Sequence, residues 1–383
     1  MTRQARPTSL LKSEKLRIIA NLLTTATTKT IMSLKQTPIQ MDRSLSIKAW
    51  LAPWLTHPDT KLSKVAGDAS FRSYYRITAE QNTTGNSLIL MDAPPDKESS
   101  HSFISLAKAW RQQGVEVPQV LAHDLQLGVA LLEDFGDLQF MQKVTNIPSV
   151  EVNQLYQQAL NQLAGIQKLT KAAAKEHPLP DYTHELLNRE LNLFDDWFFE
   201  KLLGLPKASL PKNWEVFKQA LITSALEQPQ VTVHRDYHSR NLMVLETNRL
   251  GIIDFQDAVY GPCTYDAVSL IRDCYLDWPE ATQQAWLAYF HQVYCQQASP
   301  VSLQTFTRWF DWMGMQRHLK VAGIFSRLAL RDDKPNYLLD IPLTLKHLVR
   351  ATQNYPELAD LQAWLTQVVI PNFNNFLQQR NNG

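Results

Sequence analysis

One stretch of the chain decides the fold: residues 233–243 read VHRDYHSRNLM, and residues 251–257 read GIIDFQD. Two short apolar runs, 242–245 and 250–253, lie on either side of a polar turn. This pattern is typical of a β-hairpin. The open end of the hairpin would place Asn241 beside Asp254, because facing side chains of a ladder have Cβ atoms about 5 Å apart.

The side chains expected at this open end suit phosphoryl transfer. An amide oxygen and a carboxylate are hard ligands for Mg²⁺, which takes its other ligands from water and nucleotide phosphates. Asp236 lies in the loop that enters the hairpin, where it can approach a substrate hydroxyl and accept its proton. An H-x-D-x-x-x-x-N pattern, then an apolar strand and I-D-F, is the arrangement of protein kinases and their relatives.

Nearby polar residues have simpler interpretations too. His234 and His238 are four residues apart, but a zinc-protease pair would need Glu at position 235, which is arginine, and a helix. We therefore expect His234 to be a structural histidine bonded to the backbone. Asp257 is either a second metal ligand or a loop carboxylate, and Arg240 either binds phosphate or pairs with an acid.

On both sides of this hairpin, the pattern of apolar residues predicts an α+β fold with two lobes. Expected strands are 61–66, 71–78, 87–91, 119–123 and 129–132, with helices at 44–55 and 97–113. Short turns between these strands favour an antiparallel sheet. Beyond residue 137 the apolar spacing becomes helical, with helices expected around 156–166, 191–198, 216–226, 265–275, 283–294, 306–330 and 361–369.

These patterns give four predicted segments. Residues 1–40 contain no aromatic residue and one acid, so we expect a poorly ordered extension, with a targeting or partner-binding arm as the alternative. Residues 41–132 form the nucleotide-binding N-lobe, 133–137 the hinge, and 138–383 the helical C-lobe with the catalytic loop and the acceptor site.

Composition limits the class of protein. The 383 residues carry a net charge of +1, which gives no reason to expect nucleic-acid binding driven by overall charge. The three cysteines have no C-x-x-C spacing, and no apolar run approaches the roughly 20 residues that span a bilayer. We expect a cytoplasmic protein with no membrane partner; nothing in the sequence favours one oligomeric state.

Several stretches together resemble the aminoglycoside/choline phosphotransferase family, which shares the protein-kinase-like fold. Within it, the chain is similar to kinases that act on the anomeric hydroxyl of N-acetylmuramate and N-acetylglucosamine. The similarity extends from about residue 43 to the C-terminus. The matching stretches are 67–72, 91–95, 131–137, 234–243, 253–272 and 315–325.

The resemblance implies ATP and Mg²⁺ as cofactors, a small amino sugar as partner, and a role for each matched residue. Asp236 corresponds to the catalytic base, and Asn241 and Asp254 to the magnesium ligands. The implied nucleotide contacts are Gly67, Ser70, Phe71 and Arg72 in the nucleotide loop, and Leu132, Glu133 and Phe135 at the hinge. The candidates for the acceptor pocket are Arg317, His318 and Lys320, near Trp309 and Trp312, for which core packing is an equal explanation.

The sequence departs from the protein-kinase pattern in one respect. The third strand, 87–92, lacks the lysine that holds the α- and β-phosphates in kinases. Either Arg72 or Arg76 replaces it, or the phosphate contact is looser. The alternatives to a sugar kinase are a family member acting on an aminoglycoside, choline or homoserine, and a non-catalytic nucleotide-binding pseudokinase.

Overall fold

The computed structural model describes residues 38–55, 60–66, 71–78, 87–174, 178–298 and 300–382. The chain divides into two compact units, and each is described by itself. One contains the residues before 102 together with 120–134, and the other contains 102–119 and everything from Phe135 onward. Most of the predicted extension 1–40 lies outside the described residues; only its last three residues are described, and they begin helix α2 (Pro38–Leu51).

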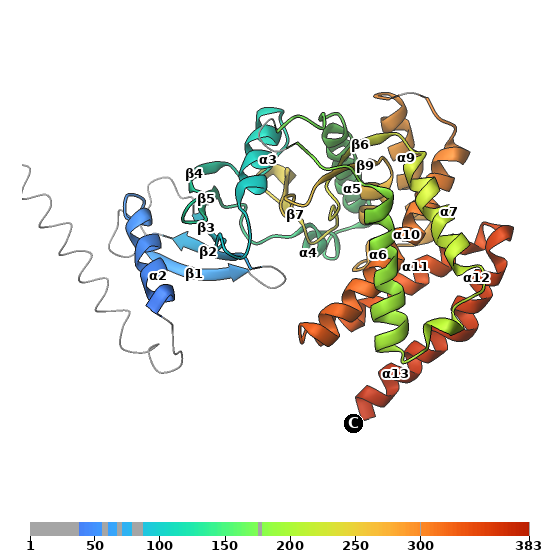
Figure 1. Cartoon of the computed structure of the whole chain (residues 1–383). Helices are drawn as coiled ribbons and strands as arrows, with labels where there is room; N and C mark the ends of the chain where they lie inside the picture. The colour runs from blue at the N-terminus through green and yellow to red at the C-terminus, as the bar shows by residue number, and fades with distance from the viewer. Residues whose placement is uncertain are drawn as a thin grey trace, which may run out of the picture. The chain divides into compact units, whose positions relative to one another are not determined.

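The first unit is built on a five-stranded antiparallel sheet (Figure 1). In spatial order the strands are β1 (Lys61–Ala66), β2 (Ser73–Thr78), β3 (Leu88–Asp92), β5 (Val129–Glu133) and β4 (Val120–Asp124). The predicted antiparallel sheet is confirmed, and each strand lies within two residues of its expected start.

The core of this unit follows from the alternation of side chains along the strands. Leu90 on β3 faces Leu131 on β5 across the ladder, and both are buried. Ile77 from β2 and Leu51 from α2 complete the same apolar cluster with Val129. Helix α2 is therefore part of the packed unit; it begins six residues and ends four residues before the helix that the sequence predicts.

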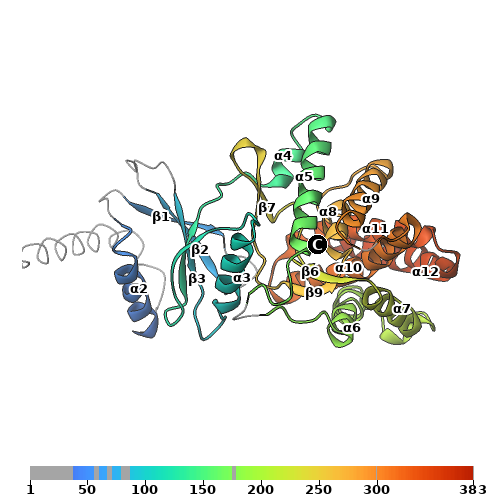
Figure 2. The same ribbon diagram turned by 90° about the horizontal axis from the view of Figure 1, so that it is seen from above.

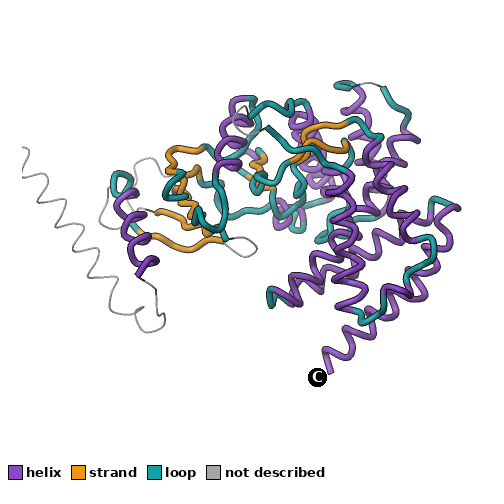
Figure 3. Tube along the Cα trace, in the orientation of Figure 1, coloured by secondary structure: helices purple, strands orange, loops and turns teal. Residues whose placement is uncertain are grey.

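The second unit is mainly helical, as Figure 3 shows. Its α-helices are α3 (His101–Gln112, which begins at the boundary), α4 (Phe140–Val144), α5 (Ser149–Gln167), α6 (His184–Leu193), α7 (Trp214–Leu226), α8 (Tyr265–Ile271), α9 (Glu280–Cys295), α10 (Leu303–Arg331), α11 (Ile341–Gln353), α12 (Ala359–Trp364) and α13 (Ile370–Asn382). Two π-helical segments, η1 (Phe194–Leu202) and η6 (Leu365–Val369), continue α6 and α12. Its strands form two pairs, β6 (Gln230–Val233) with β9 (Val259–Pro262), and β7 (Leu242–Val244) with β8 (Leu250–Ile252).

Helix α10 is the centre of this unit and packs on α6, η1, α7, α8 and α11 (Figures 1 and 2). Its close approach to α6 depends on Gly323, because a Cβ there would lie 2.3 Å from the carbonyl carbon of Leu193. Lys320 and Gln316 lie one and two turns earlier, respectively, on the same face of α10. The sequence predicts α10 but not α11 or α13. None of the helices in the described part of the chain has the length and apolar character needed to cross a membrane.

Candidate active site

The hairpin that the sequence predicts is present. Strands β7 and β8 pair antiparallel, with Leu242 opposite Ile252. At the open end the Ile253 N–H donates to the Asn241 carbonyl oxygen over 3.1 Å. The next residue, Asp254, has a positive φ of 65°, and its Oδ2 lies 3.4 Å from Asn241 Nδ2. The expected juxtaposition of Asn241 and Asp254 is confirmed.

The loop that enters the hairpin is held by a buried carboxylate. Asp266, on α8, accepts hydrogen bonds from the backbone N–H groups of His234 (2.7 Å) and Arg235 (3.0 Å). Burial raises the pKa of Asp266 to about 7, and the two backbone donors oppose that rise. Arg235 needs such support because its φ of 75° is left-handed and disfavoured for a side chain with a Cβ.

His234 is a structural histidine, as expected. It is fully buried, its Nε2 lies 3.0 Å from the Ile253 carbonyl oxygen, and its Nδ1 accepts from the Asp236 N–H. Burial lowers the pKa of His234 to about 4, so the ring is neutral. Both ring nitrogens face the backbone, which leaves none for zinc.

A second carboxylate fixes the far end of the loop. Asp273, just after α8, is fully buried; it accepts from the Ser239 N–H over 2.9 Å and from the Tyr275 N–H over 3.1 Å. The guanidinium of Arg240 lies over the Tyr275 ring, 3.6 Å from its centroid, and 3.9 Å from Asp340. Of the two interpretations of Arg240, the structure favours pairing with an acid.

Asp236 lies between these anchors. Its carbonyl oxygen accepts from Asn241 Nδ2 over 3.0 Å, which ties the two residues together. Burial raises the pKa of the Asp236 carboxyl, but the nearby cations Lys320 and Arg235 outweigh burial and hold that pKa below its ordinary value. The carboxylate is thus kept ionised, as a proton acceptor must be.

The oxygen atoms at the hairpin end fit a magnesium ion. Asn241 uses its amide nitrogen toward Asp236 and Asp254, so its Oδ1 could serve as a metal ligand. Desolvation, and then the neighbouring Asp236 carboxylate, raise the pKa of Asp254 above its ordinary value. Within the described ranges, no cluster of three or more His, Cys, Asp or Glu is arranged to hold a metal. One carboxylate and one amide, completed by water and phosphate, suit Mg²⁺.

The expected acceptor residues separate into two groups. Arg317 is 2 % exposed, yet within the described part of the chain it has no ion pair or hydrogen bond, and its Nη1 is a buried atom without a partner. Burial lowers the pKa of the guanidinium, but Cys274, Tyr265, Asp273 and Asp236 raise it, because they lie nearby although none of them forms an ion pair or hydrogen bond with it.

The other two candidates are already engaged. Lys320 Nζ lies 2.8 Å from the Tyr265 hydroxyl and 3.1 Å from Glu190. His318 is fully buried, its Nε2 lies 3.0 Å from the Arg272 carbonyl oxygen, and its ring stacks on His347. The structure therefore leaves Arg317 as the candidate for direct acceptor contact and places His318 in the core.

The predicted nucleotide contacts belong mostly to the first unit. Gly67 and Ser70 lie outside the described residues, Phe71 is 66 % exposed, and Leu132 is buried on β5 with Glu133 after it. Arg72 is 3 % exposed and pairs with Glu98 over 2.7 Å, whereas Arg76 makes two bonds to Asp134. Phe135, in the second unit, packs on the hairpin, where a Cβ at Gly251 would lie 2.5 Å from its ring.

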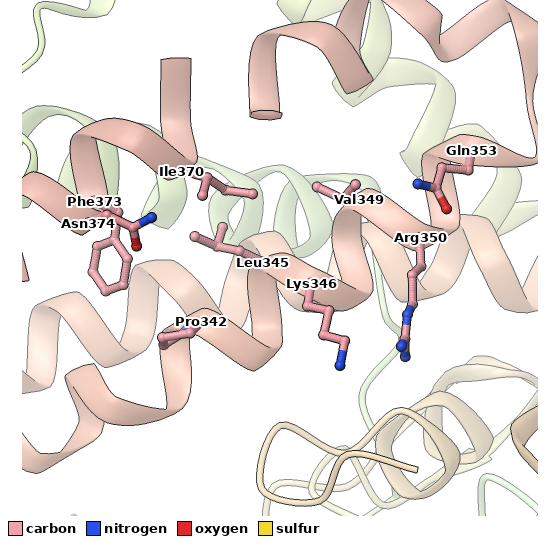
Figure 4. Close-up of a pocket in the computed structure, with 9 residues that line it drawn as sticks. All are labelled: Pro342, Leu345, Lys346, Val349, Arg350, Gln353, Ile370, Phe373 and Asn374. Atoms are coloured by element: carbon pink, nitrogen blue, oxygen red, sulfur yellow. The ribbon is translucent and has the colours of Figure 1, made fainter. Parts of the chain in front are cut away.

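A groove of about 390 Å³ lies elsewhere in the second unit, between α11 and α13 (Figure 4). Leu345, Ile370 and Phe373 contribute apolar side chains to its lining, and Lys346 and Arg350 contribute cations from α11. Both cations pair with Asp277. None of the expected site residues lines this groove.

Comparison with known proteins identifies the class of site. A model of the phosphotransferase enzyme family matches residues 61–309, more than half of the chain, including Asp236, Asn241 and Asp254. The chain belongs to this family. It is 40 % identical over 333 residues to the N-acetylmuramate/N-acetylglucosamine kinase of Neisseria meningitidis serogroup B, covering 86 % of this chain and 97 % of that protein. It is 38 % identical to the protein of the same name from Pseudomonas putida, covering 86 % and 94 %.

Solved structures agree on the fold of this phosphotransferase. The ethanolamine kinase of Plasmodium vivax superposes with a TM-score of 0.57 at 10 % identity, covering 87 % of this chain and 94 % of that one. The GDP complex of aminoglycoside 2'-phosphotransferase-IIIa gives 0.54 at 15 % identity, covering 82 % and 99 %. The expected two-lobed, protein-kinase-like α+β fold is confirmed.

Three acidic side chains around the loop are absent from the residues expected from sequence. Asp266 lies inside a stretch that carries the family resemblance, which was the available signal for it. Asp273 and Glu190 sit in ordinary helical patterns, where an acid is usually solvated. Their partners lie 34 and 45 residues away along the chain, so only the fold reveals them.

Proposed function

We propose that the protein is an ATP- and Mg²⁺-dependent kinase that phosphorylates the anomeric hydroxyl of N-acetylmuramate and N-acetylglucosamine, giving the α-1-phosphate. The observation that carries the proposal is the convergence of Asp236, Asn241 and Asp254 at one hairpin end, in a chain about 40 % identical to kinases named for these sugars. Such a reaction belongs in the cytoplasm, where ATP is available, and returns cell-wall sugars to metabolism.

In this mechanism Asp236 accepts the proton of the anomeric hydroxyl. The sugar oxygen forms a bond to the γ-phosphorus as the bond from that phosphorus to the β-phosphate bridging oxygen breaks, and ADP leaves. Asn241 and Asp254 would hold Mg²⁺, which neutralises phosphate charge. Because Asn241 also bonds the Asp236 backbone, the metal ligands and the proton acceptor share one rigid loop.

Arg72 and Arg76 both remain candidates for the phosphate clamp of the first unit. Arg76 makes two bonds to Asp134, just after β5. Arg72 pairs with Glu98, which precedes α3, over 2.7 Å. Kinases likewise hold the phosphate-binding lysine with an acid. Gly67, Ser70 and Phe71 remain the proposed nucleotide loop, and the hinge contacts remain Leu132, Glu133 and Phe135.

Arg317 is the proposed contact to the lactyl carboxylate of N-acetylmuramate. A buried guanidinium with no acidic partner is costly, and a carboxylate is the ligand that its planar fork matches best. N-acetylglucosamine lacks this carboxylate and would leave Arg317 unpaired. Lys320, being bonded to Glu190 and Tyr265, would act through its charge rather than by touching the sugar.

An acceptor panel tests the proposal. The full chain would be given ATP and Mg²⁺ with each reducing sugar, with methyl glycosides of N-acetylglucosamine as matched controls, and with choline, homoserine and an aminoglycoside. We expect ADP release with both reducing sugars and none with the methyl glycosides, which have no free anomeric hydroxyl. Turnover of a methyl glycoside would move the reaction to another hydroxyl, and turnover confined to choline, homoserine or the aminoglycoside would refute the sugar assignment. Nucleotide binding without any transfer would indicate a pseudokinase.

A further inference from the structure

Glu190, on α6, is the meeting point of a buried polar cluster beside the catalytic loop. Its side chain is 4 % exposed. One carboxylate oxygen pairs with Arg235 and with Lys320, the latter at 3.1 Å. The other accepts from the Tyr182 hydroxyl and from Gln316 Nε2 at 3.2 Å. Four polar groups, from α10, the catalytic loop and the segment before α6, therefore meet at one carboxylate.

The partner that matters most is Arg235, the residue before Asp236. Its left-handed backbone, with a φ of 75°, costs on the order of 1–3 kcal/mol and persists only where the surroundings enforce it. Asp266 holds the backbone N–H of Arg235, and Glu190 holds its guanidinium. The residue that aims Asp236 is thus fixed at both ends by buried carboxylates.

Helix packing explains how Glu190 reaches the loop. Gln316, Lys320 and Gly323 follow one another at spacings of four and three residues, so they share a face of α10. Gly323 lets the α6 backbone come within contact of that face at Leu193. One turn earlier on α6, Glu190 then meets Gln316 and Lys320 directly.

The continuation of the same helix offers a matched comparison. Asp195, five residues on, also forms a buried ion pair, with Lys218 at 2.6 Å, and accepts from Trp214 Nε1. Both partners belong to α7, and neither lies in the catalytic loop. Asp195 and Glu190 are therefore similarly buried, and each forms an ion pair. They differ because Glu190 binds the catalytic loop and Asp195 binds α7.

We propose that Glu190 is a positioning residue of the phosphoryl-transfer site, which fixes Arg235 and through it the direction of Asp236. The inference rests on the proposed role of Asp236 but not on the identity of the acceptor. Glu190 touches no reacting atom in this scheme. Its removal should slow the transfer step and leave substrate binding almost unchanged.

The test is a double-mutant cycle in kcat, with the full chain, ATP, Mg²⁺ and the acceptor that the wild type uses. Glu190→Gln and Arg235→Gln should each lower kcat by on the order of 10- to 100-fold, the cost of a misplaced catalytic group. Both KM values should stay within about threefold. The double variant should lose no more than the larger single loss, because the two residues act as one unit. Asp195→Asn should lower the unfolding temperature and keep kcat within about threefold.

Three results would overturn the inference: a kcat of Glu190→Gln close to wild type, losses that multiply in the double variant, or an equal kcat loss in Asp195→Asn. If Glu190→Gln does not fold, Glu190→Asp replaces it. Aspartate keeps the negative charge, but its side chain is one methylene group shorter, so a wild-type kcat for this variant would refute the positioning role. A different acceptor would refute the sugar assignment and leave this comparison intact.

Discussion

Arg272 and Arg317 are buried to the same extent, with 2 % of each residue exposed, but their surroundings differ. Arg272, just after α8, lies 2.7 Å from Asp311 on α10, and the Tyr355 hydroxyl bonds the other oxygen of that carboxylate. Arg317, also on α10, has no such partner in the part of the chain that the structure describes. Among the described residues, the other buried cations, Arg72, Lys218 and Lys320, each pair with an acid.

The difference separates structure from function on a single helix. A buried charge is tolerated when an opposite charge lies beside it, so the Arg272–Asp311 ion pair belongs to the core. An unpaired buried charge weakens the fold unless a ligand compensates for it, which is why we propose Arg317 as a contact to the acceptor. Variants of the core pair at Arg272 should therefore reduce stability, whereas variants of the proposed site, such as those at Arg317, should reduce turnover.

The largest effect is expected at the reaction centre. Asp236→Asn keeps the shape of the side chain and removes the proton acceptor, so turnover should fall by on the order of 10²–10⁴-fold. Nucleotide affinity, measured by calorimetry with Mg²⁺, should hardly change, because Asn241 and Asp254 remain. Near-normal turnover would show that Asp236 is not the proton acceptor, and the proposed active site would then no longer stand in contrast to the core.

On the core side, Arg272→Met should reduce stability. It leaves the Asp311 carboxylate buried without its cation, which costs about 3–5 kcal/mol in the free energy of unfolding. Denaturant titration measures that loss, and turnover per folded molecule should stay within about threefold of wild type. An unchanged unfolding free energy would show that the pair is not structural.

A smaller effect is expected from acid. The His347 ring stacks on His318 with centroids 5.2 Å apart, and burial, with Arg272 nearby, lowers the pKa of His347 to about 3. Since the unfolded chain takes up that proton near pH 6.5, stability is intact above that pH and is lost as pH falls toward 3, by about 2 kcal/mol at pH 5. His347→Gln should flatten this part of the stability profile; identical profiles for variant and wild type would rule out the assignment.

Local sequence patterns predicted the sheet and the catalytic hairpin well. Alternating runs bounded by turns fix strands such as β3, and the two apolar runs around residues 246–249 fix the contact of Asn241 with Asp254. The sequence did not predict roles for Glu190 and Asp273, because both side chains bind loop atoms that are far away in the sequence. The sequence could not distinguish the roles of Arg317, His318 and Lys320 on α10, because the ion pair of Lys320 and the burial of His318 depend on tertiary contacts.

The most direct test of the account is the acceptor preference of Arg317→Met. Methionine keeps most of the buried aliphatic volume and removes the unpaired charge, so the variant should be at least as stable as wild type. For N-acetylmuramate, kcat/KM should fall on the order of 10²-fold, because its carboxylate loses the buried partner. For N-acetylglucosamine it should stay within about threefold. Equal losses on both sugars, or a loss of stability like that of Arg272→Met, would contradict the proposed contact and show that Arg317 has a structural role.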